Sequence, residues 1–491
     1  MNKFSKLLGF DPEGKQTTVK TELIAGVVTF LAMAYILTVN PNQIFGAGSP
    51  YWASAFIATA LGAVIGTLLM AFLAKMPLAQ ASGMGLNSML GGMIGGWGGY
   101  GTFTPGQAFM LVLISGFIFL LLSIVKIKGK TFRELVFDGM PVAVRSAISV
   151  GIGLFIAYIG FQNAGVIVAD PYVQVSFANF TKWTGEGATA KFASVALIGL
   201  FLITVLDKLE VKGSVILGIL GAAIVGIPLG VTDLSILKGS GDISWKFWEN
   251  FKNFFAGDNS VFGSFTDVFK DGLLPGGTSV FTIIMIVITL CMIDMFDTMG
   301  TIVGCCGGNR ILSDENNKPH NYGKIMISDA VATCTGAMLG TSTVTTFVES
   351  GAGVSAGGRT GLTAFTTACL FFLAMFMLPV FAAIPSAAAA SALIYVGVLM
   401  MKHNIKSIDF STAINATAAF LTIAVMVLSY SITKGIGVGM IAYTIMAALS
   451  YVVELIVSLI KKTEKPKWEV SIVALVVTAL FVVYFFVPAT I

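Results

Sequence analysis

Residues 341–361 read TSTVTTFVESGAGVSAGGRTG, and this stretch decides how the chain is interpreted. It places Glu349 among glycines and small hydroxyl side chains in a very apolar sequence. The β-branched run from Thr343 to Thr346 favours an extended start, so the segment is not an ordinary lipid-facing helix. Acidic side chains at bilayer depth persist mainly where they face a cavity, a partner or a substrate. A buried acid beside interrupted backbone is typical of the binding site of a secondary transporter.

The overall composition indicates a membrane protein. Of 491 residues, 56% are hydrophobic and 11% are charged, and the mean hydropathy is +0.89. A soluble domain carries about 25% charged residues, which excludes that class. The net charge of +4 is small. It predicts no nucleic-acid partner, because Lys and Arg in short loops serve to set membrane topology.

The apolar runs predict an all-α polytopic membrane protein with seven plus seven spans in a lipid bilayer. The first set lies at 21–39, 52–74, 84–97, 105–125, 141–162, 192–206 and 213–231. The second set lies at 279–304, 325–340, 344–357, 361–381, 385–401, 411–432 and 436–460, with one further run at 469–488. Between the sets, residues 232–278 are expected to form a polar extracellular loop.

Loop charges predict a cytoplasmic amino terminus, residues 1–20, on a multi-pass protein of the plasma membrane. The basic residues that fall on one side of this topology are Lys3, Lys6, Lys15, Lys20, Lys126, Lys128, Lys130, Arg133, Lys208, Lys212, Lys402 and Lys406. An odd number of spans in each half would insert the two halves with opposite polarity, as an inverted repeat requires.

Comparison of the two halves supports such a repeat. Pro141 and Pro385 are followed by small residues at the same offsets, and ALGAVIGT (60–67) resembles CTGAMLGT (334–341). Small residues are also common at helix contacts in any membrane protein, and both explanations stay open. The third span, PLAQASGMGLNSMLGGMIGG from Pro77, is as short and glycine-rich as the stretch quoted first. Paired interruptions at corresponding positions indicate a site near the middle of the membrane.

Four stretches resemble the signatures of the AzgA-like purine permeases, a branch of the nucleobase–cation symporter (nucleobase–ascorbate transporter) superfamily. They are FDPEGKQTTVKTELIAGVVTFLAMAYILTVNP (10–41), SGMGLN (82–87), DMFDTMGT (294–301) and GTSTVTTFVESGAGVSAGGRTGLTA (340–364). The resemblance implies a fourteen-helix inverted repeat in which spans 3 and 10 each start as a short strand. It also implies a core domain (21–126 and 279–381) and a gate domain (141–231 and 385–460), with residues 461–491 as a carboxyl-terminal segment outside the template.

The same resemblance implies proton-driven uptake of a purine nucleobase, namely hypoxanthine, guanine or adenine, and a homodimer through the gate domain. The chain departs from the family at Ser82, where proline is usual, and at Ser88-Met89-Leu90, where an aromatic residue is frequent. Because these positions flank the expected site, the preferred base stays open.

Carboxylates are expected to build the substrate site. By resemblance, Glu349 corresponds to the acidic binding residue of span 10 and Asp294 to that of span 8. A carboxylate accepts two parallel N–H bonds, which matches the N1–H and 2-amino edge of guanine. Asn87 offers both a donor and an acceptor for the remaining edge. Backbone groups near three further residues are expected to add bonds: Gly85, Val348 and Ser350.

Each of these residues has an alternative role. Glu349 is alternatively a cap of the half-helix that follows it, and Asn87 an interhelical hydrogen bond. Asp297, about one turn after Asp294, either contacts substrate or supports the site through neighbouring groups. Two further residues are expected to lie outside the site: Asp329 as a structural or cytoplasmic-facing group and Arg359 extending to the membrane surface.

Proton coupling is expected because burial disfavours the charged form of a carboxyl group and a second acid disfavours it further. Asp294 or Glu349 would carry the proton. No cofactor or metal is expected, since His320, His403 and the five cysteines lack ligand spacing. No nucleophile or acid–base set stands out, which argues against an enzyme. Two alternatives remain. One is a transporter of the same fold that carries xanthine, uracil or an anion, and the other is a channel.

Overall fold

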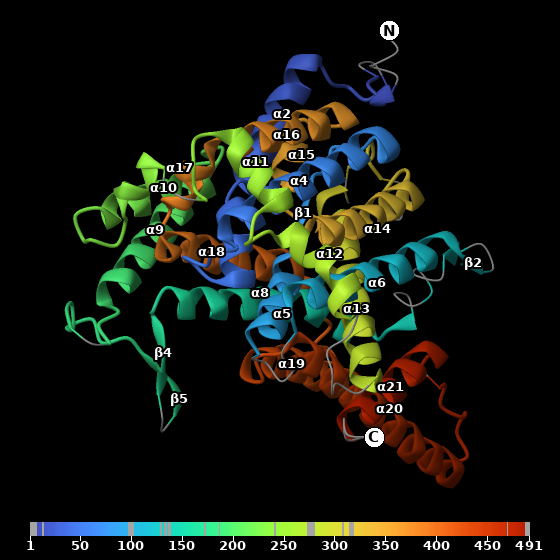
Figure 1. Cartoon of the computed structure of the whole chain (residues 1–491). Helices are drawn as coiled ribbons and strands as arrows, with labels where there is room; N and C mark the ends of the chain where they lie inside the picture. The colour runs from blue at the N-terminus through green and yellow to red at the C-terminus, as the bar shows by residue number, and fades with distance from the viewer. Residues whose placement is uncertain are drawn as a thin grey trace.

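The chain folds into a mostly helical, multi-span membrane protein (Figure 1). The computed structural model describes residues 7–11, 14–96, 103–127, 130–131, 135, 139–170, 173–185, 187–239, 242–272, 280–306, 309–313, 319–468 and 470–486. Within these residues, nine helices are long and apolar enough to cross a membrane. Four of the residues that predicted the orientation lie outside the described part: Lys3, Lys6, Lys128 and Arg133.

The elements follow the predicted apolar runs to within a few residues. The first half contains α2 (Val19–Met33), α3 (Ile36–Phe45), α4 (Trp52–Leu69), η1 (Met70–Ala74), β1 (Gln80–Ser82), α5 (Met84–Gly95), α6 (Pro105–Ile124), β2 (Lys126–Ile127), β3 (Lys130–Thr131), α8 (Val142–Asn163), β4 (Ile167–Asp170), β5 (Gln174–Phe177), α9 (Ala190–Lys208) and α10 (Ser214–Gly226). The second half contains η2 (Leu234–Lys238), α11 (Phe247–Ala256), α12 (Val261–Asp271), α13 (Val280–Cys306), α14 (Tyr322–Leu339), β6 (Val344–Thr346), α15 (Ser350–Ser355), α16 (Gly361–Ala374), η3 (Met375–Met377), α17 (Leu378–Ala382), α18 (Ser386–Asn404), η4 (Ile405–Ser407), α19 (Ala413–Leu428), α20 (Ile432–Lys461) and α21 (Ile472–Phe486).

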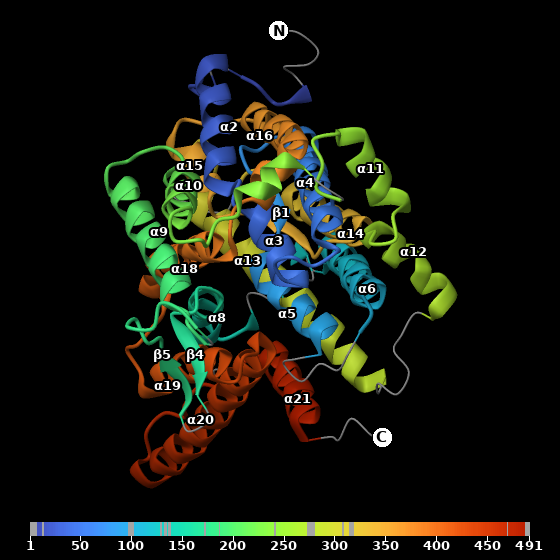
Figure 2. The same cartoon turned by 60° about the vertical axis from the view of Figure 1, so that its left-hand side comes forward.

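Strands β1 and β6 form a two-stranded antiparallel pair in the interior. Gln80 pairs with Thr346 at one end and Ser82 with Val344 at the other, and every residue of both strands is buried. The pairing satisfies backbone groups that an apolar medium would otherwise leave unpaired. Figures 1 and 2 show β1 among the helices, with α15 and α5 on opposite sides of it. The predicted extended start of this segment is confirmed.

The other spans pack as two groups. The α4 group contains α2, α4, α6, α14 and α16, and the α8 group contains α8, α9, α10, α18, α19 and α20. In the α8 group, α8 and α18 cross so closely that a Cβ at Gly397 would lie 2.4 Å from the Gly153 carbonyl oxygen. These two glycines stand at the same offset from Pro141 and Pro385. The matched small residues of the two halves therefore contact each other.

The first span, Val19–Phe45, has a short break at Ala34 and Tyr35, where α2 ends and α3 begins. The sequence predicts one run at 21–39, but α2 ends before Ala34 and α3 continues to Phe45. Pro41 lies inside α3 and lacks an N–H, so it cannot bond the carbonyl of Leu37. The break places Tyr35 between two helical segments.

The described part of residues 232–278, which were expected to form a polar extracellular loop, contains short helices, and its side of the membrane stays a prediction. It contains η2, α11 and α12, because aromatic residues such as Phe247 and Phe251 recur at helical spacing and stack on one another. The connection after α8 forms the hairpin of β4 and β5, which the apolar runs did not predict.

Candidate functional site

Glu349 lies where the chain leaves β6 and begins α15. It is 6% exposed. Its Oε1 accepts a 2.6 Å hydrogen bond from the Tyr35 hydroxyl, whereas its buried Oε2 has no hydrogen-bond partner among the described residues. Glu349 occupies the N-cap position of α15, but its side chain makes no capping bond. The alternative role as a helix cap is therefore not supported, and one carboxylate oxygen stays available to a ligand.

Tyr35 is the site residue that sequence reasoning missed. It is 1% exposed, and its hydroxyl lies 2.6 Å from Glu349 Oε1 and 3.8 Å from the Met84 sulfur. Tyr35, at the break in the first span, thus contacts the start of each of the two half-helices, α5 and α15. A phenol within an otherwise apolar run was the only signal for it, and sequence alone does not identify a partner 314 residues away.

Asp294 and Asp297 lie about one turn apart on α13 and contact different elements. Asp294 is fully buried, and its Oδ2 accepts a 3.0 Å bond from the Thr333 hydroxyl on α14. Asp297 is partly exposed, and its Oδ2 lies 3.5 Å from the Thr345 hydroxyl on β6. The Thr345 bond connects Asp297 to the strand pair, whereas the Thr333 bond connects Asp294 to α14. The role of Asp294 in substrate binding stays a prediction.

Asp329 on α14 ties the strand pair to α13. Its Oδ1 accepts bonds from Gln80 Nε2 at 3.0 Å and from the Thr346 hydroxyl at 3.4 Å. Its Oδ2 accepts a 2.7 Å bond from the Thr298 hydroxyl. The expected structural role of Asp329 agrees with these contacts. Asp329, Asp297 and Glu349 thus all lie beside the strand pair.

Asn87 connects three segments through its amide. Its Nδ2 donates to Gln43 Oε1 at 3.2 Å, and its Oδ1 accepts from the Ser82 hydroxyl at 3.3 Å and from the Ser342 hydroxyl. Asn87 is fully buried. These contacts agree with the alternative of an interhelical hydrogen bond, and direct contact with substrate stays a prediction.

The backbone groups expected to assist differ in their availability. The Val348 carbonyl accepts from Gly351 N at 3.0 Å, and Ser350 N donates to the Phe347 carbonyl at 3.1 Å. Both groups therefore hold the turn after β6 together. Gly85 lies in the first turn of α5, where N–H groups have no intrahelical acceptor.

Gly85 also marks the contact between the two helix groups. A Cβ at this position would lie 3.3 Å from Ile152 of α8 and 3.4 Å from Ile432 of α20. The absence of a side chain lets the start of α5 lie directly against the α8 group.

Arg359 and Glu22 make hydrogen bonds within the segment that follows the carboxyl end of α15. Arg359 is half-buried and donates to the Val354 carbonyl at 2.5 Å and to the Gly358 carbonyl at 2.7 Å. These bonds hold the turn after α15, and the expectation that Arg359 extends to the membrane surface stays a prediction. Glu22 is fully buried and accepts backbone N–H bonds from Arg359, Thr360 and Thr363 at 2.9, 3.3 and 3.2 Å. It thereby caps the start of α16.

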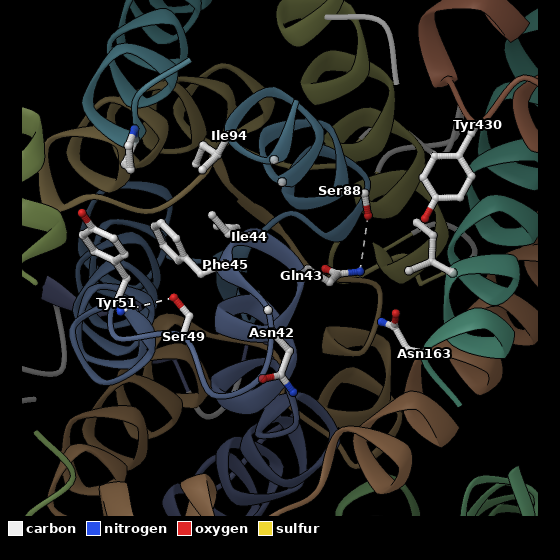
Figure 3. Close-up of a pocket in the computed structure, with 15 residues that line it drawn as sticks. Asn42, Gln43, Ile44, Phe45, Ser49, Tyr51, Ser88, Ile94, Asn163 and Tyr430 are labelled. Carbon is white, nitrogen blue, oxygen red and sulfur yellow. Dashed lines mark hydrogen bonds between the residues drawn. The ribbon is translucent and has the colours of Figure 1, made fainter. Parts of the chain in front are cut away.

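A cavity of about 530 Å³ lies between the α4 and α8 groups, next to α3 and α5. Figure 3 shows Gln43 and Ser88 on one side of it and Asn163 and Tyr430 on the other. None of its lining side chains is charged.

The chemistry of these groups suits a neutral polar ligand. Within the described residues, no set of three or more His, Cys, Asp or Glu side chains is arranged to hold a metal ion. The crossing of the half-helices instead offers a buried carboxylate oxygen, the amide of Asn87 and several hydroxyls. Such groups recognise ring N–H donors and exocyclic oxygen atoms.

Comparison with known proteins is consistent with this chemistry. Residues 20–438 match the model Xan_ur_permease, described as the Permease family. The chain is 35% identical over 443 residues to the guanine/hypoxanthine permease PbuO of Bacillus subtilis (strain 168), covering 89% of this chain and 94% of the relative. It is 32% identical over 445 residues to the adenine permease AdeP of Escherichia coli (strain K12), covering 88% and 87%. The transmembrane domain of a cyanobacterium bicarbonate transporter, BicA, matches with a TM-score of 0.56 at 16% identity, covering 84% of this chain and 97% of that one, which shows a shared fold.

Proposed function

The chain belongs to the permease family of Xan_ur_permease, and we propose that it imports purine nucleobases, hypoxanthine and guanine and also adenine, by proton symport. Members of this family are transporters rather than enzymes, and relatives at 35% and 32% identity bear the names guanine/hypoxanthine permease and adenine permease. The relatives support the purine class, and the site chemistry supports a neutral base.

The observation that carries this proposal is the unpartnered Oε2 of Glu349. A buried acceptor without a partner costs about 1–3 kcal/mol, which a ligand N–H would recover. Hypoxanthine and guanine present such a donor at N1, guanine adds a parallel one at its 2-amino group, and adenine would donate from its 6-amino group instead. Tyr35 holds the other oxygen, Oε1, and so fixes the direction in which Oε2 points.

Proton coupling uses the same carboxylates. With a proton on Glu349 or on an acid of α13, the site carries less buried negative charge, which is the favoured state for a low-dielectric interior. The charges of Asp329 and Glu349 both repel a charge on Asp297. Protonation of one of these acids would therefore reduce the electrostatic repulsion on the others. Release of the proton on the cytoplasmic side would restore the repulsion and promote release of the base.

Transport would proceed by alternating access in a fourteen-span, seven-plus-seven inverted repeat. The α4 group, with α13 and the half-helices, would act as the core domain, and the α8 group as the gate domain. Movement of one group against the other would expose the crossing of β1 and β6 to each side in turn. The amino terminus would lie in the cytoplasm, in a protein of the plasma membrane.

Uptake of labelled hypoxanthine in a host without base transporters tests the proposal. Unlabelled guanine, adenine, xanthine and uracil compete at two external pH values, with Glu349→Gln and Asp294→Asn beside the wild type and exposed Glu454→Gln as the matched control. We expect saturable uptake that is stimulated by acid, blocked by purines and lost in the first two variants. Full pH-driven accumulation in both of those variants would refute the assigned roles, and no purine uptake by well-expressed wild type would refute the substrate.

A further inference from the structure

The cavity of Figure 3 lies on the access side of the site, away from the amino terminus. It is lined by Asn42, Gln43 and Phe45 at the end of the first span, whereas the amino terminus precedes the other end at Val19. A 27-residue helical span covers about 40 Å. With a cytoplasmic amino terminus, the cavity therefore faces the outside, from which an imported base arrives.

The floor of the cavity lies close to the Glu349 site. Ser88, on the floor, lies one helical turn beyond Met84 on α5, and its hydroxyl donates to the Met84 carbonyl at 3.4 Å. The Met84 sulfur in turn lies 3.8 Å from the Tyr35 hydroxyl that holds Glu349. Gln43, also on the floor, accepts a bond from Asn87. Ser88 thus connects the cavity to the Glu349 site through Met84 and Tyr35.

The lining matches a flat, neutral, hydrogen-bonding ligand. Asn163 presents an amide donor and an amide acceptor, and an amide of this kind pairs with a purine edge through two bonds, as Asn and Gln do with adenine in DNA. The Gln43 amide bonds Asn87 and Ser88 and so joins this lining to α5. Phe45 and Tyr51 form a stacked pair with ring centroids 5.2 Å apart at the same cavity. The volume of about 530 Å³ lies within the range of roughly 300–1,000 Å³ typical of small-molecule sites.

We propose that this cavity is a second binding site for purine bases, which a base occupies before it reaches Glu349. This inference rests on the proposed function and adds a site to it. Gln43 and Ser88 come from segments associated with the α4 group, and Asn163 and Tyr430 come from the α8 group. Its walls thus belong to the two bodies that move in transport, so the site exists in the outward-open arrangement and is lost as the groups close.

Protection of an engineered thiol tests the second site directly. Asn163 is exposed at the carboxyl end of α8, so Asn163→Cys is expected to fold. It is placed in the Glu349→Gln background, where the central site is disabled, and its rate of labelling by a membrane-impermeant methanethiosulfonate is measured with and without hypoxanthine. The parent without the new thiol gives the background, since Cys369 is exposed and the other four cysteines are buried. Gln162→Cys, a neighbour that does not line the cavity, is the matched control.

We expect saturating hypoxanthine to slow labelling of Asn163→Cys at least five-fold and to leave Gln162→Cys unchanged. The addition of Phe45→Ala, which removes one ring of the stacked pair, is expected to abolish protection. A rate of labelling of Asn163→Cys that does not change when hypoxanthine is added would refute the second site. Uptake by Asn163→Cys with Glu349 intact, measured in the same cells, reports on the proposed function separately. Purine uptake without thiol protection would therefore refute this inference and leave the proposed function in place.

A kinetic measurement gives an independent readout. Asn163→Ala is expected to raise the KM for hypoxanthine about five-fold and to leave kcat unchanged, because the variant weakens arrival of the base but not the central site. Gln162→Ala is the control. An unchanged KM in Asn163→Ala would contradict the proposal.

Discussion

The hydroxyl of Tyr35 donates a 2.6 Å hydrogen bond to Oε1 of Glu349, and so joins the break in the first span to the start of α15. Because one oxygen of the carboxylate is held in this way, the other keeps a fixed direction. Tyr35 is therefore a positioning residue for the acid that we propose to bind the base.

Tyr35→Phe keeps the ring and removes this bond. A hydrogen bond to a charged acceptor is worth about 1.5–3 kcal/mol, so kcat/KM for hypoxanthine is expected to fall about ten-fold to hundred-fold. Initial uptake rates over a range of hypoxanthine concentrations measure this, with half-buried Tyr451→Phe on α20 as the control. Wild-type kinetics in Tyr35→Phe would mean that Glu349 needs no such support.

Asn87→Ala is expected to lower thermal stability as well as uptake. The change leaves Gln43 and Ser342 without a partner that they have in the folded protein, at a cost of about 1–3 kcal/mol. Thermal unfolding of the purified protein in detergent measures this, and Glu349→Gln serves as a comparison. Loss of uptake in Asn87→Ala with a wild-type Tm would instead favour direct contact between Asn87 and the substrate.

Glu22→Gln tests the cap of α16. The glutamine can keep one acceptor, but its NH₂ group would face the backbone N–H groups of residues that Glu22 now binds, such as Thr363. Loss of a helix cap costs about 1–2 kcal/mol, which in a chain of this length would lower the Tm by about 1–2 °C.

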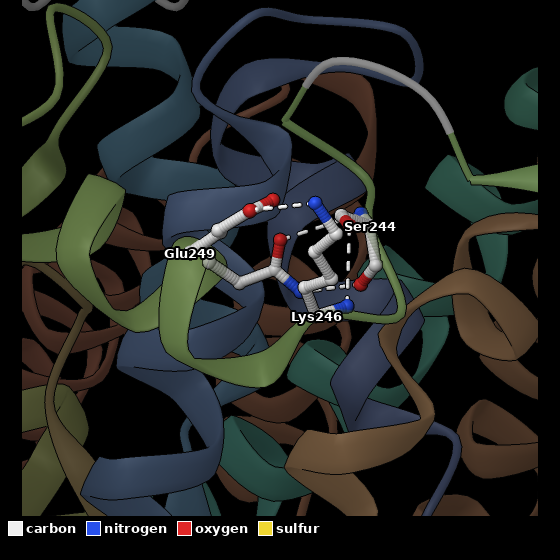
Figure 4. Close-up of polar contacts among 4 residues, drawn as sticks. Ser244, Lys246 and Glu249 are labelled. Carbon is white, nitrogen blue, oxygen red and sulfur yellow. Dashed lines mark hydrogen bonds and ion pairs between the residues drawn. The ribbon is translucent and has the colours of Figure 1, made fainter.

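The control for that change is Glu249→Gln at the start of α11. Figure 4 shows Glu249 paired with Lys246 at 2.8 Å, and these side chains are 57% and 74% exposed. Exposed pairs contribute little to stability, so its Tm is expected to equal that of the wild type. Equal Tm values for both variants would show that the buried cap is dispensable.

Gly85→Ala is expected to slow transport without preventing folding. The added methyl would lie 3.3 Å from Ile152 and 3.4 Å from Ile432, and these flexible side chains can shift. The contact lies between the two groups that would move, so the maximal rate of hypoxanthine uptake is expected to fall several-fold.

Gly353→Ala gives the contrast. Its Cβ would lie 2.0 Å from the Thr29 hydroxyl and 2.8 Å from the Ala25 carbonyl, so little folded protein is expected at the membrane. Surface expression and uptake rate separate the two outcomes. A Gly85→Ala protein with an unchanged maximal rate would remove this contact from the transport cycle.

Local signals explain what the sequence predicted correctly. The β-branched run before Glu349 favours extended backbone, and the structure places β6 there. Glu349 could be identified because a charged side chain in an apolar segment is energetically costly and persists mainly at functional positions. The helix positions follow from apolar runs long enough to cross a bilayer.

Long-range contacts explain what it did not predict. The partner of Tyr35 lies 314 residues away, and the Ser342 hydroxyl that binds Asn87 lies 255 residues away. No local pattern encodes such pairs.

The pairing of β1 with β6 also constrains when the protein can finish folding during its synthesis. Ser82 emerges from the ribosome 262 residues before its strand partner Val344, which at 5–20 residues per second is about 15 to 50 s of synthesis. Throughout that interval the buried N–H and C=O groups of β1 lack their final partners in a medium that supplies few others. The first half of the chain must therefore wait at the membrane in an unfinished form. A truncation anywhere before residue 344 is expected to leave a product that cellular quality control removes.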